Sequence, residues 1–395
     1  MTKNKKKIIN DPVYGFINIP NEELYDIVQS PVLQRLRRIK QLGLSCLVYP
    51  GAEHSRFSHS LGAMHLMVQA LDVLIQKGVV ITEEEYNGAL AAILLHDVGH
   101  SPFSHCLEHF FFDCSHEELS SMFMSQMQIS QTARQIFENT YPKQFLHQLV
   151  SSQLDTDRLD YLTRDSFFTG VSEGVIGTER ILKMFNVGRG ELMVDEKGVY
   201  SIEKFIISRR LMYWQVYMHK TVVAADNLMT NILKRARDLQ SIGKLKIENY
   251  MISPHLAYFL ERGVRSIEDN EAIHHYVLID DSDVWSCVKT WSEHEDAILS
   301  FLSSSLINRR LGKITIQDTP FTDSQKEELC KYKTEEEKRY FTSSAQLHNK
   351  AYNFQDTGIN ILYKDGSVKE ICEASDQLDR DFLSKEIRKY FFYQI

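Results

Sequence analysis

The chain has 395 residues, of which 43% are hydrophobic and 25% are charged, so it is long enough for two or three globular domains or for one large core with appendages. No apolar run approaches the roughly 18 residues that a membrane helix needs, which argues against a membrane-spanning protein. The formal net charge of −8 argues against bulk DNA or RNA binding, but it leaves room for one small anionic substrate.

The cysteines and the N-terminus indicate a cytoplasmic protein. The six cysteines are scattered and form no Cys-x-x-Cys pair, which favours reduced thiols. The basic start, residues 1–7, is not followed by the apolar segment of a secretory signal. We therefore expect a cytoplasmic protein with no membrane association.

Helical periodicity dominates the first three quarters of the chain. A short strand is expected at 46–49, and a hairpin over 188–200 with its turn at 195–198. We expect helices over about 22–42, 58–77, 83–96, 106–112, 117–126, 132–139, 147–151, 158–163 and 202–239, and further helices between 254 and 303.

The last part of the chain changes character. A strand is expected at 313–316, a hairpin from 359–363 and 368–371, and a final helix over 382–391. The predicted fold class is therefore mainly α. A helical core with its helical extension is expected over residues 1–304, and a small α+β region over residues 305–395.

Four residues in three apolar, helix-like stretches suggest one metal site: His59, the adjacent pair His96 and Asp97, and Asp157. Burying such side chains unpaired is costly, and a divalent cation would satisfy them together. Their nitrogen and oxygen atoms suit iron, manganese, nickel, cobalt, zinc or magnesium better than calcium, and the absence of thiolate argues against a structural zinc site. A lone His-Asp pair would more often be a helix end with ordinary hydrogen bonds.

Several histidines follow the His-Asp pair. His100, His105 and His116 lie within twenty residues of it, and Glu108 stands three residues after His105. Histidine is the usual general acid or base near neutral pH. Gly99 and Pro102 should end the preceding helix, so the first two of these histidines could lie over the metal.

Three motifs occur in order: Arg56–Gly62 (RFSHSLG), His96–His105 (HDVGHSPFSH) and Asp157–Asp165 (DRLDYLTRD). Together they resemble the HD-domain deoxynucleoside triphosphate (dNTP) triphosphohydrolases, and most of all the HD domain of the animal SAM- and HD-domain enzymes. The similarity runs from Ile9–Pro12 to Tyr217–Lys220, and more weakly to about Arg310. The resemblance implies an all-helical HD core. It also implies that the same four residues, His59, His96, Asp97 and Asp157, hold the metal.

The resemblance also implies roles at the phosphates. His100, His105 and His116 should face them, and His116 should protonate the leaving 5′ oxygen, supported by Glu108 where the family usually has Asp. The implied phosphate ligands are Arg56, Arg158, Arg209 and Lys220. Any one of these cations taken alone would pass for a solvated surface residue.

The sugar site follows from the same resemblance. Gln41 and Asp165 match residues that bind the 3′-hydroxyl, with Leu42 beside them, and the rings of Tyr161 and Tyr217 should line the deoxyribose. A tyrosine against C2′ would leave no room for a 2′-hydroxyl. Ordinary core packing is the alternative for both tyrosines.

The function expected is metal-dependent hydrolysis of a dNTP, with dGTP as the default, to deoxynucleoside and tripolyphosphate. Alternatives are another HD phosphohydrolase, such as a 5′-nucleotidase or a cyclic-nucleotide phosphodiesterase, or a nucleotide-binding regulator with little hydrolysis. Gln34 and Arg37 match two residues that bind a nucleotide activator in some relatives, so an activator is a possible partner. We further expect a homo-oligomer, a dimer or a tetramer.

Overall fold

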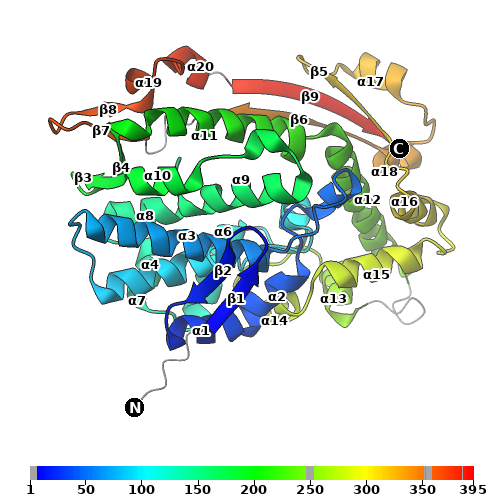
Figure 1. The fold of residues 1–395 in the computed structure, drawn as a ribbon. Coiled ribbons are helices and arrows are strands. Elements are labelled where there is room, and N and C mark those ends of the chain that lie inside the picture. Colours follow the sequence, from blue (N-terminus) through cyan, green and yellow to red (C-terminus); the bar gives the residue numbers. More distant parts are fainter. Residues whose placement is uncertain (1–6, 246–252, 351, 353–357, 385) are drawn as a thin grey trace.

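Three helices from separate parts of the chain form the centre of the molecule: α3 (Arg56–Gln76), α4 (Glu83–Leu95) and α9 (Thr156–Thr169). The computed structural model describes residues 7–245, 253–350, 352, 358–384 and 386–395. In it, α3 packs against both other helices, and α11 (Val199–Met212) covers the same bundle (Figure 1). The expected mainly α fold is confirmed.

A polar side chain caps the N-terminus of each central helix. The side chains of Ser55 and Asp155 accept hydrogen bonds from the first turns of α3 and α9. Thr82 begins α4 in a capping box with Glu85. Such caps satisfy backbone N–H groups that have no partner within the helix. The caps therefore fix where each helix begins, and with it the positions of the side chains that follow.

Shorter elements surround the first two central helices. A hairpin of β1 (Lys7–Asp11) and β2 (Gly15–Ile19) lies at the N-terminal end. The expected single helix over 22–42 is wrong, because Pro31 starts a second helix and only short turns follow it. The elements are α1 (Glu22–Gln29), α2 (Pro31–Arg35), η1 (Leu36–Arg38), η2 (Gly43–Leu47), η3 (Ser104–Leu107), α5 (Glu108–Phe111), α6 (His116–Gln126), α7 (Gln131–Phe137) and α8 (Gln144–Val150).

Two further segments differ from the expectations. The expected strand at 46–49 is instead the end of the 3-10 turn η2 and the turn residues after it. The hairpin exists as β3 (Phe185–Gly188) and β4 (Glu191–Asp195), but its turn is Arg189–Gly190, where both residues have positive φ. The neighbouring elements are η4 (Ser172–Gly174), α10 (Thr178–Met184) and η5 (Glu196–Gly198).

The expected long helix over 202–239 is interrupted. It consists of α11, a π-helical turn η6 (Tyr213–Tyr217), and α12 (Lys220–Ser241). The N–H of Met218 donates to the carbonyl of Tyr213 at 2.7 Å, and the His219 side chain caps α12. Single π-helical turns are frequent at functional sites. The extra residue in this turn changes which side chains face the bundle.

The C-terminal part combines helices with two sheets. Its helices are α13 (Pro254–Arg262), α14 (Asn270–Val277), α15 (Asp281–Trp291), α16 (Ala297–Ile307), α17 (Asp323–Leu329), α18 (Glu335–Phe341), α19 (Ile371–Ala374) and α20 (Arg380–Ser384). Its strands are β5 (Lys313–Gln317), β6 (Thr342–Lys350), β7 (Asn360–Leu362), β8 (Val368–Glu370) and β9 (Glu386–Gln394).

The expected helix over 382–391 is wrong, since most of it is β9. This strand lies between β5 and β6, and both pairings are antiparallel. Its aromatic run, which includes Phe391, Phe392 and Tyr393, suits a strand that packs on both sides. The hairpin of β7 and β8 is confirmed, and β7 pairs in parallel with β4 of the preceding region. The domain boundary at residue 304 stays a prediction.

Among the described residues, no helix combines the length and the apolar character that crossing a membrane requires.

Candidate active site

Three of the four expected metal ligands, His59, His96 and Asp157, have ligand atoms within 4.8 Å of one another between α3, the end of α4 and the start of α9, and Asp97 lies beside the two histidines. His59 Nε2 lies 3.2 Å from His96 Nε2 and 3.0 Å from Asp157 Oδ1. Asp97 places its carboxylate 3.3 Å from His96 Nε2 and 3.5 Å from His59 Nε2. Two imidazoles and two carboxylates from three helices thus share a space of a few ångströms.

The hydrogen bonds behind the two imidazoles determine which nitrogen faces this space. His96 Nδ1 lies 2.6 Å from the carbonyl oxygen of Ile93, which can only accept, so Nδ1 carries the proton. His59 Nδ1 lies 2.7 Å from Asp160 Oδ2 in the same way. In the neutral form of each ring, Nε2 then carries the lone pair, and the two Nε2 atoms face each other. A divalent cation fits this donor set, because it would be bound by both nitrogens and both carboxylates.

Asp160 is itself held in place. Arg164 donates to its two oxygens at 2.9 and 3.0 Å, and it also donates to Asp11 at 2.8 Å. The close approach of α9 to α3 requires Gly62 of the first motif, because a Cβ there would lie 2.0 Å from Asp160 Oδ1. A buried carboxylate supported in this way fixes the ring of a ligating histidine. The spacing of Asp157, Asp160 and Arg164 on one helix face could have indicated that the last two residues support His59. Neither Asp160 nor Arg164 was predicted to have a role.

The charges around the four groups favour a cation. Burial opposes protonation of His59, but hydrogen bonds to Asp157 and Asp160 outweigh it and raise the pKa of His59 to about 10. Burial also opposes ionisation of Asp97, yet Arg56 and the nearby imidazoles hold the pKa of Asp97 well below its usual value. The carboxylates therefore stay ionised, and the site attracts positive charge.

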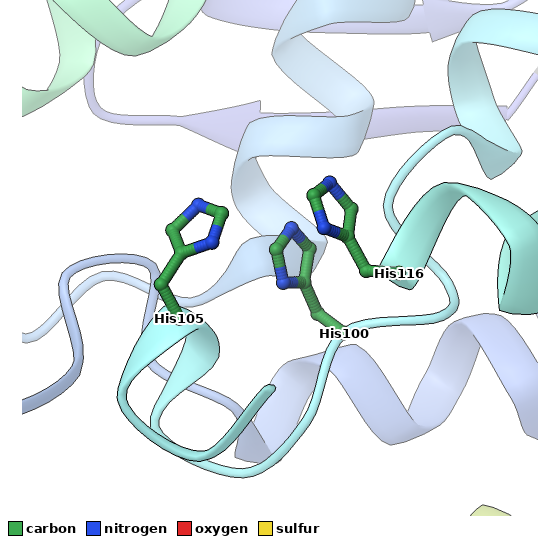
Figure 2. A group of neighbouring side chains, drawn as sticks. All are labelled: His100, His105 and His116. Carbon is green, nitrogen blue, oxygen red and sulfur yellow. The ribbon is translucent and has the colours of Figure 1, made fainter. Parts of the chain in front are cut away.

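His100, His105 and His116 form one group, as Figure 2 shows, and His100 Nε2 lies 3.3 Å from Asp97 Oδ1. The rings of His100 and His116 are stacked with centroids 3.8 Å apart, and His105 lies at right angles to His100 at 4.8 Å. Burial and the neighbouring Arg56 lower the pKa of His100 well below its usual value, so it is neutral. His105 is largely exposed, whereas His100 is buried.

Glu108 joins two of these histidines. One of its carboxylate oxygens lies 2.9 Å from His105 Nδ1, and the other lies 2.5 Å from His116 Nδ1. Burial opposes ionisation of Glu108, but these two hydrogen bonds hold its pKa well below the usual value. An ionised Glu108 therefore orients both rings through Nδ1 and leaves their Nε2 atoms for other partners.

A cleft of about 410 Å³ opens beside these groups. Its walls contain one face of α9, the segment before η2, and the π-helical turn η6. Its lining residues are Gln41, Leu42, Arg56, His105, Glu117, Asp157, Arg158, Tyr161, Asp165, Tyr213 and Tyr217. Seven of the nine expected substrate residues belong to this lining, and Arg209 and Lys220 do not.

The cations at the cleft make local contacts. Arg56 donates to Asp97 and, at 2.7 Å, to Ser104. Arg158 donates through Nε to the carbonyl of Ser152 at 2.6 Å. Arg209 donates to Gln153 at 3.2 Å, and Lys220 is exposed at the start of α12. The first two cations therefore border the cleft in fixed positions.

Two lining residues were missed. Tyr213 lies four residues before Tyr217, and their rings meet edge to face at 5.2 Å. Helical spacing alone places such a pair on one side, so the pair could have been found from the sequence. Glu117 follows His116, and its carboxylate lies 3.3 Å from His116 Nε2. An exposed acid in a helix's first turn gives no signal of this contact.

The chain is similar to known proteins over most of its length. A family model described as an HD associated region matches residues 176–251. The uncharacterized protein YwfO of Bacillus subtilis is 32% identical over 393 residues, which cover 94% of this chain and 88% of that protein. The chain belongs to the same family as this Bacillus protein.

Two further relatives have names that state an activity. The crystal structure of a phosphohydrolase from Bacteroides thetaiotaomicron has a TM-score of 0.93 and 46% identity, covering 99% of this chain and all of that one. The human deoxynucleoside triphosphate triphosphohydrolase SAMHD1 is 29% identical over 298 residues, 62% of this chain and 47% of that protein. The resemblance drawn from the three motifs is confirmed, and the protein is an HD-domain phosphohydrolase.

Proposed function

We propose that the protein hydrolyses dNTPs to deoxynucleoside and tripolyphosphate with the help of a divalent metal ion. One observation carries the proposal. The site of His59, His96, Asp97 and Asp157 adjoins a cleft. Arg56 and Arg158 line the cleft near the metal site, and Tyr161, Tyr217 and Asp165 line its other end. A triphosphate carries about four negative charges, so it suits the first end, and a deoxyribose suits the second.

Different residues of the chain would have different roles in the reaction. Water attacks the α-phosphorus, and the bond between that phosphorus and the 5′ oxygen breaks. His116, oriented through Nδ1 by Glu108, would give its proton to the leaving 5′ oxygen. Arg56 and Arg158 would neutralise the tripolyphosphate. A bound divalent cation would supply Lewis-acid polarisation and a more acidic water.

Sugar selection would depend on the tyrosines. Tyr217 donates its hydroxyl to Asp165 at 2.8 Å, and its ring meets that of Tyr161 edge to face at 6.0 Å. Two rings fixed in this way would leave little space beside C2′. A ribonucleotide would then lose affinity, because its 2′-hydroxyl would have neither room nor a partner.

Product analysis tests the proposal. Metal-loaded protein is incubated with each dNTP and each ribonucleotide, dGTP first, and the products are separated by anion exchange. Deoxynucleoside with intact tripolyphosphate is the expected result. Activity on nucleoside monophosphates or cyclic nucleotides alone would instead favour another phosphohydrolase, and binding without turnover under several metals would favour a regulator.

A further inference from the structure

His54 contacts both residues that are expected to bind the 3′-hydroxyl. It lies two residues before α3, where residues 39–41 run antiparallel to residues 54–56. The N–H of Gln41 donates to the carbonyl of His54 at 3.0 Å, and the N–H of Arg56 donates to the carbonyl of Ile39 at 2.9 Å. This short ladder places Gln41 at the cleft through the backbone of His54.

The side chain of His54 holds the second residue. His54 Nε2 lies 2.7 Å from Asp165 Oδ1, and each side chain is 1% exposed. The other oxygen of Asp165 accepts the Tyr217 hydroxyl at 2.8 Å. The imidazole is stacked on Phe168, with centroids 4.5 Å apart and planes 17° apart. The Asp165 carboxylate is therefore fixed at both oxygens, and His54 supplies one of the two donors.

Hydrogen-bonding capacity remains at this end of the cleft. Gln41 Oε1 is buried and has no partner within the described part of the chain. A carboxylate offers about four lone-pair sites, so Asp165 can accept a further hydrogen bond after His54 and Tyr217. A buried acceptor without a partner is costly. A hydroxyl group between Gln41 and Asp165 has one proton, so it would donate to Asp165 or to Gln41 Oε1, and its oxygen could accept from the Gln41 amide N–H. Both residues line the cleft.

We propose that His54 is the positioning residue of the 3′-hydroxyl site. Its carbonyl sets Gln41 and its imidazole sets Asp165, so that the two side chains bracket one sugar hydroxyl. The inference rests on the proposed function, because it assumes a deoxynucleotide in this cleft. Preference for a substrate with a 3′-hydroxyl then depends on the Nε2–H of His54, a group that itself need not touch the substrate.

Kinetics with a matched pair of substrates tests the role. For metal-loaded protein, kcat and KM are measured with dGTP and with 2′,3′-dideoxyguanosine triphosphate, which lacks only the 3′-hydroxyl. The variants are His54→Phe, which keeps a ring over Phe168, and His54→Gln, whose amide can take the place of imidazole Nε2. His294→Gln changes a buried histidine outside the cleft and serves as the control.

Wild-type protein and the control should prefer dGTP. His54→Phe should lower that preference roughly tenfold to a hundredfold, as expected for the loss of a hydrogen bond to a charged group, by weakening dGTP turnover alone. His54→Gln should keep most of it. If His54→Phe does not fold, His54→Asn replaces it, because its shorter amide cannot reach Asp165.

Three results would overturn the role. His54→Phe could slow both substrates equally, as a merely structural residue would, or it could leave the preference unchanged. His54→Gln could lose the preference as fully as His54→Phe does. In each of these cases dGTP hydrolysis by the wild-type protein still stands. Absence of dGTP turnover in the wild-type protein would instead overturn the proposed function, and the role of His54 with it.

Discussion

His59 Nδ1 lies 2.7 Å from Asp160 Oδ2, and both side chains are fully buried. This pair directs His59 Nε2 toward His96, Asp97 and Asp157. Neither Asp160 nor its partner Arg164 faces the cleft. The ability of the site to bind a metal therefore depends on residues behind it, as is common for ligating histidines.

Asp160→Asn should weaken metal binding about 10- to 100-fold while the four proposed ligands stay in place. The amide has about the size of the carboxylate but no charge, so it supports His59 less well and leaves Arg164 partly unpaired. Metal affinity is measured by competition with a chelator. Asp72→Asn changes an exposed acid on the same helix as His59 and is the control. Wild-type affinity in the Asp160 variant would show that the pair is not needed.

The metal-free protein should lose stability as the pH rises from neutral to alkaline values. In the metal-free fold the pKa of His59 is about 10, above its unfolded value of about 6.5. A raised folded pKa stabilises the fold fully below the unfolded pKa, and this stabilisation is lost as pH rises through about 10. The Tm of metal-free protein should therefore fall between pH 7 and 10, and that of metal-loaded protein should fall less. Parallel Tm curves for the two forms would contradict this account.

His116→Ala should lower kcat by about 10²- to 10⁴-fold and leave KM nearly unchanged, because a general acid acts in the transition state. The measurement is steady-state kinetics on dGTP. His109→Ala removes an exposed histidine on the adjacent α5 and should leave both constants unchanged. Normal kcat in the His116 variant would assign proton transfer to another group.

Tyr217→Ala should relax the discrimination against ribonucleotides, since the ring beside the sugar is lost. Tyr217→Phe keeps the ring and removes only the hydroxyl that donates to Asp165. It should still exclude ribonucleotides. The ratio of kcat/KM for dGTP to that for GTP measures the effect. If the ratio does not change in the Ala variant, steric exclusion by this tyrosine is wrong.

Local patterns in the sequence predicted the parts of the site that share a helix or a motif. His96 and Asp97 follow an apolar helix directly, and Asp157, Tyr161 and Asp165 lie along one face of α9. The three motifs, taken together in their order along the chain, predicted that these groups share one site with His59. These side chains lie within a few ångströms of one another, and their role as metal ligands stays a prediction.

What could not be predicted depends on contacts between distant segments. The pairing of His54 with Asp165 joins residues 111 positions apart, and no periodicity indicates it. Strand β9 lies between β5 and β6 in the sheet, and these pairings with distant segments cannot be seen in its own sequence. The π-helical turn at Tyr213–Tyr217 has no breaking residue in its sequence, so helical spacing alone predicts that α11 continues.

The account depends most directly on one divalent ion held by His59, His96, Asp97 and Asp157. The deciding measurement is the metal content of purified wild-type protein and of Asp157→Ala, determined by elemental analysis together with dGTP turnover of the same samples. The account predicts one ion per chain and turnover in the wild-type protein, and neither in the variant. A variant that hydrolyses dGTP without bound metal would contradict it.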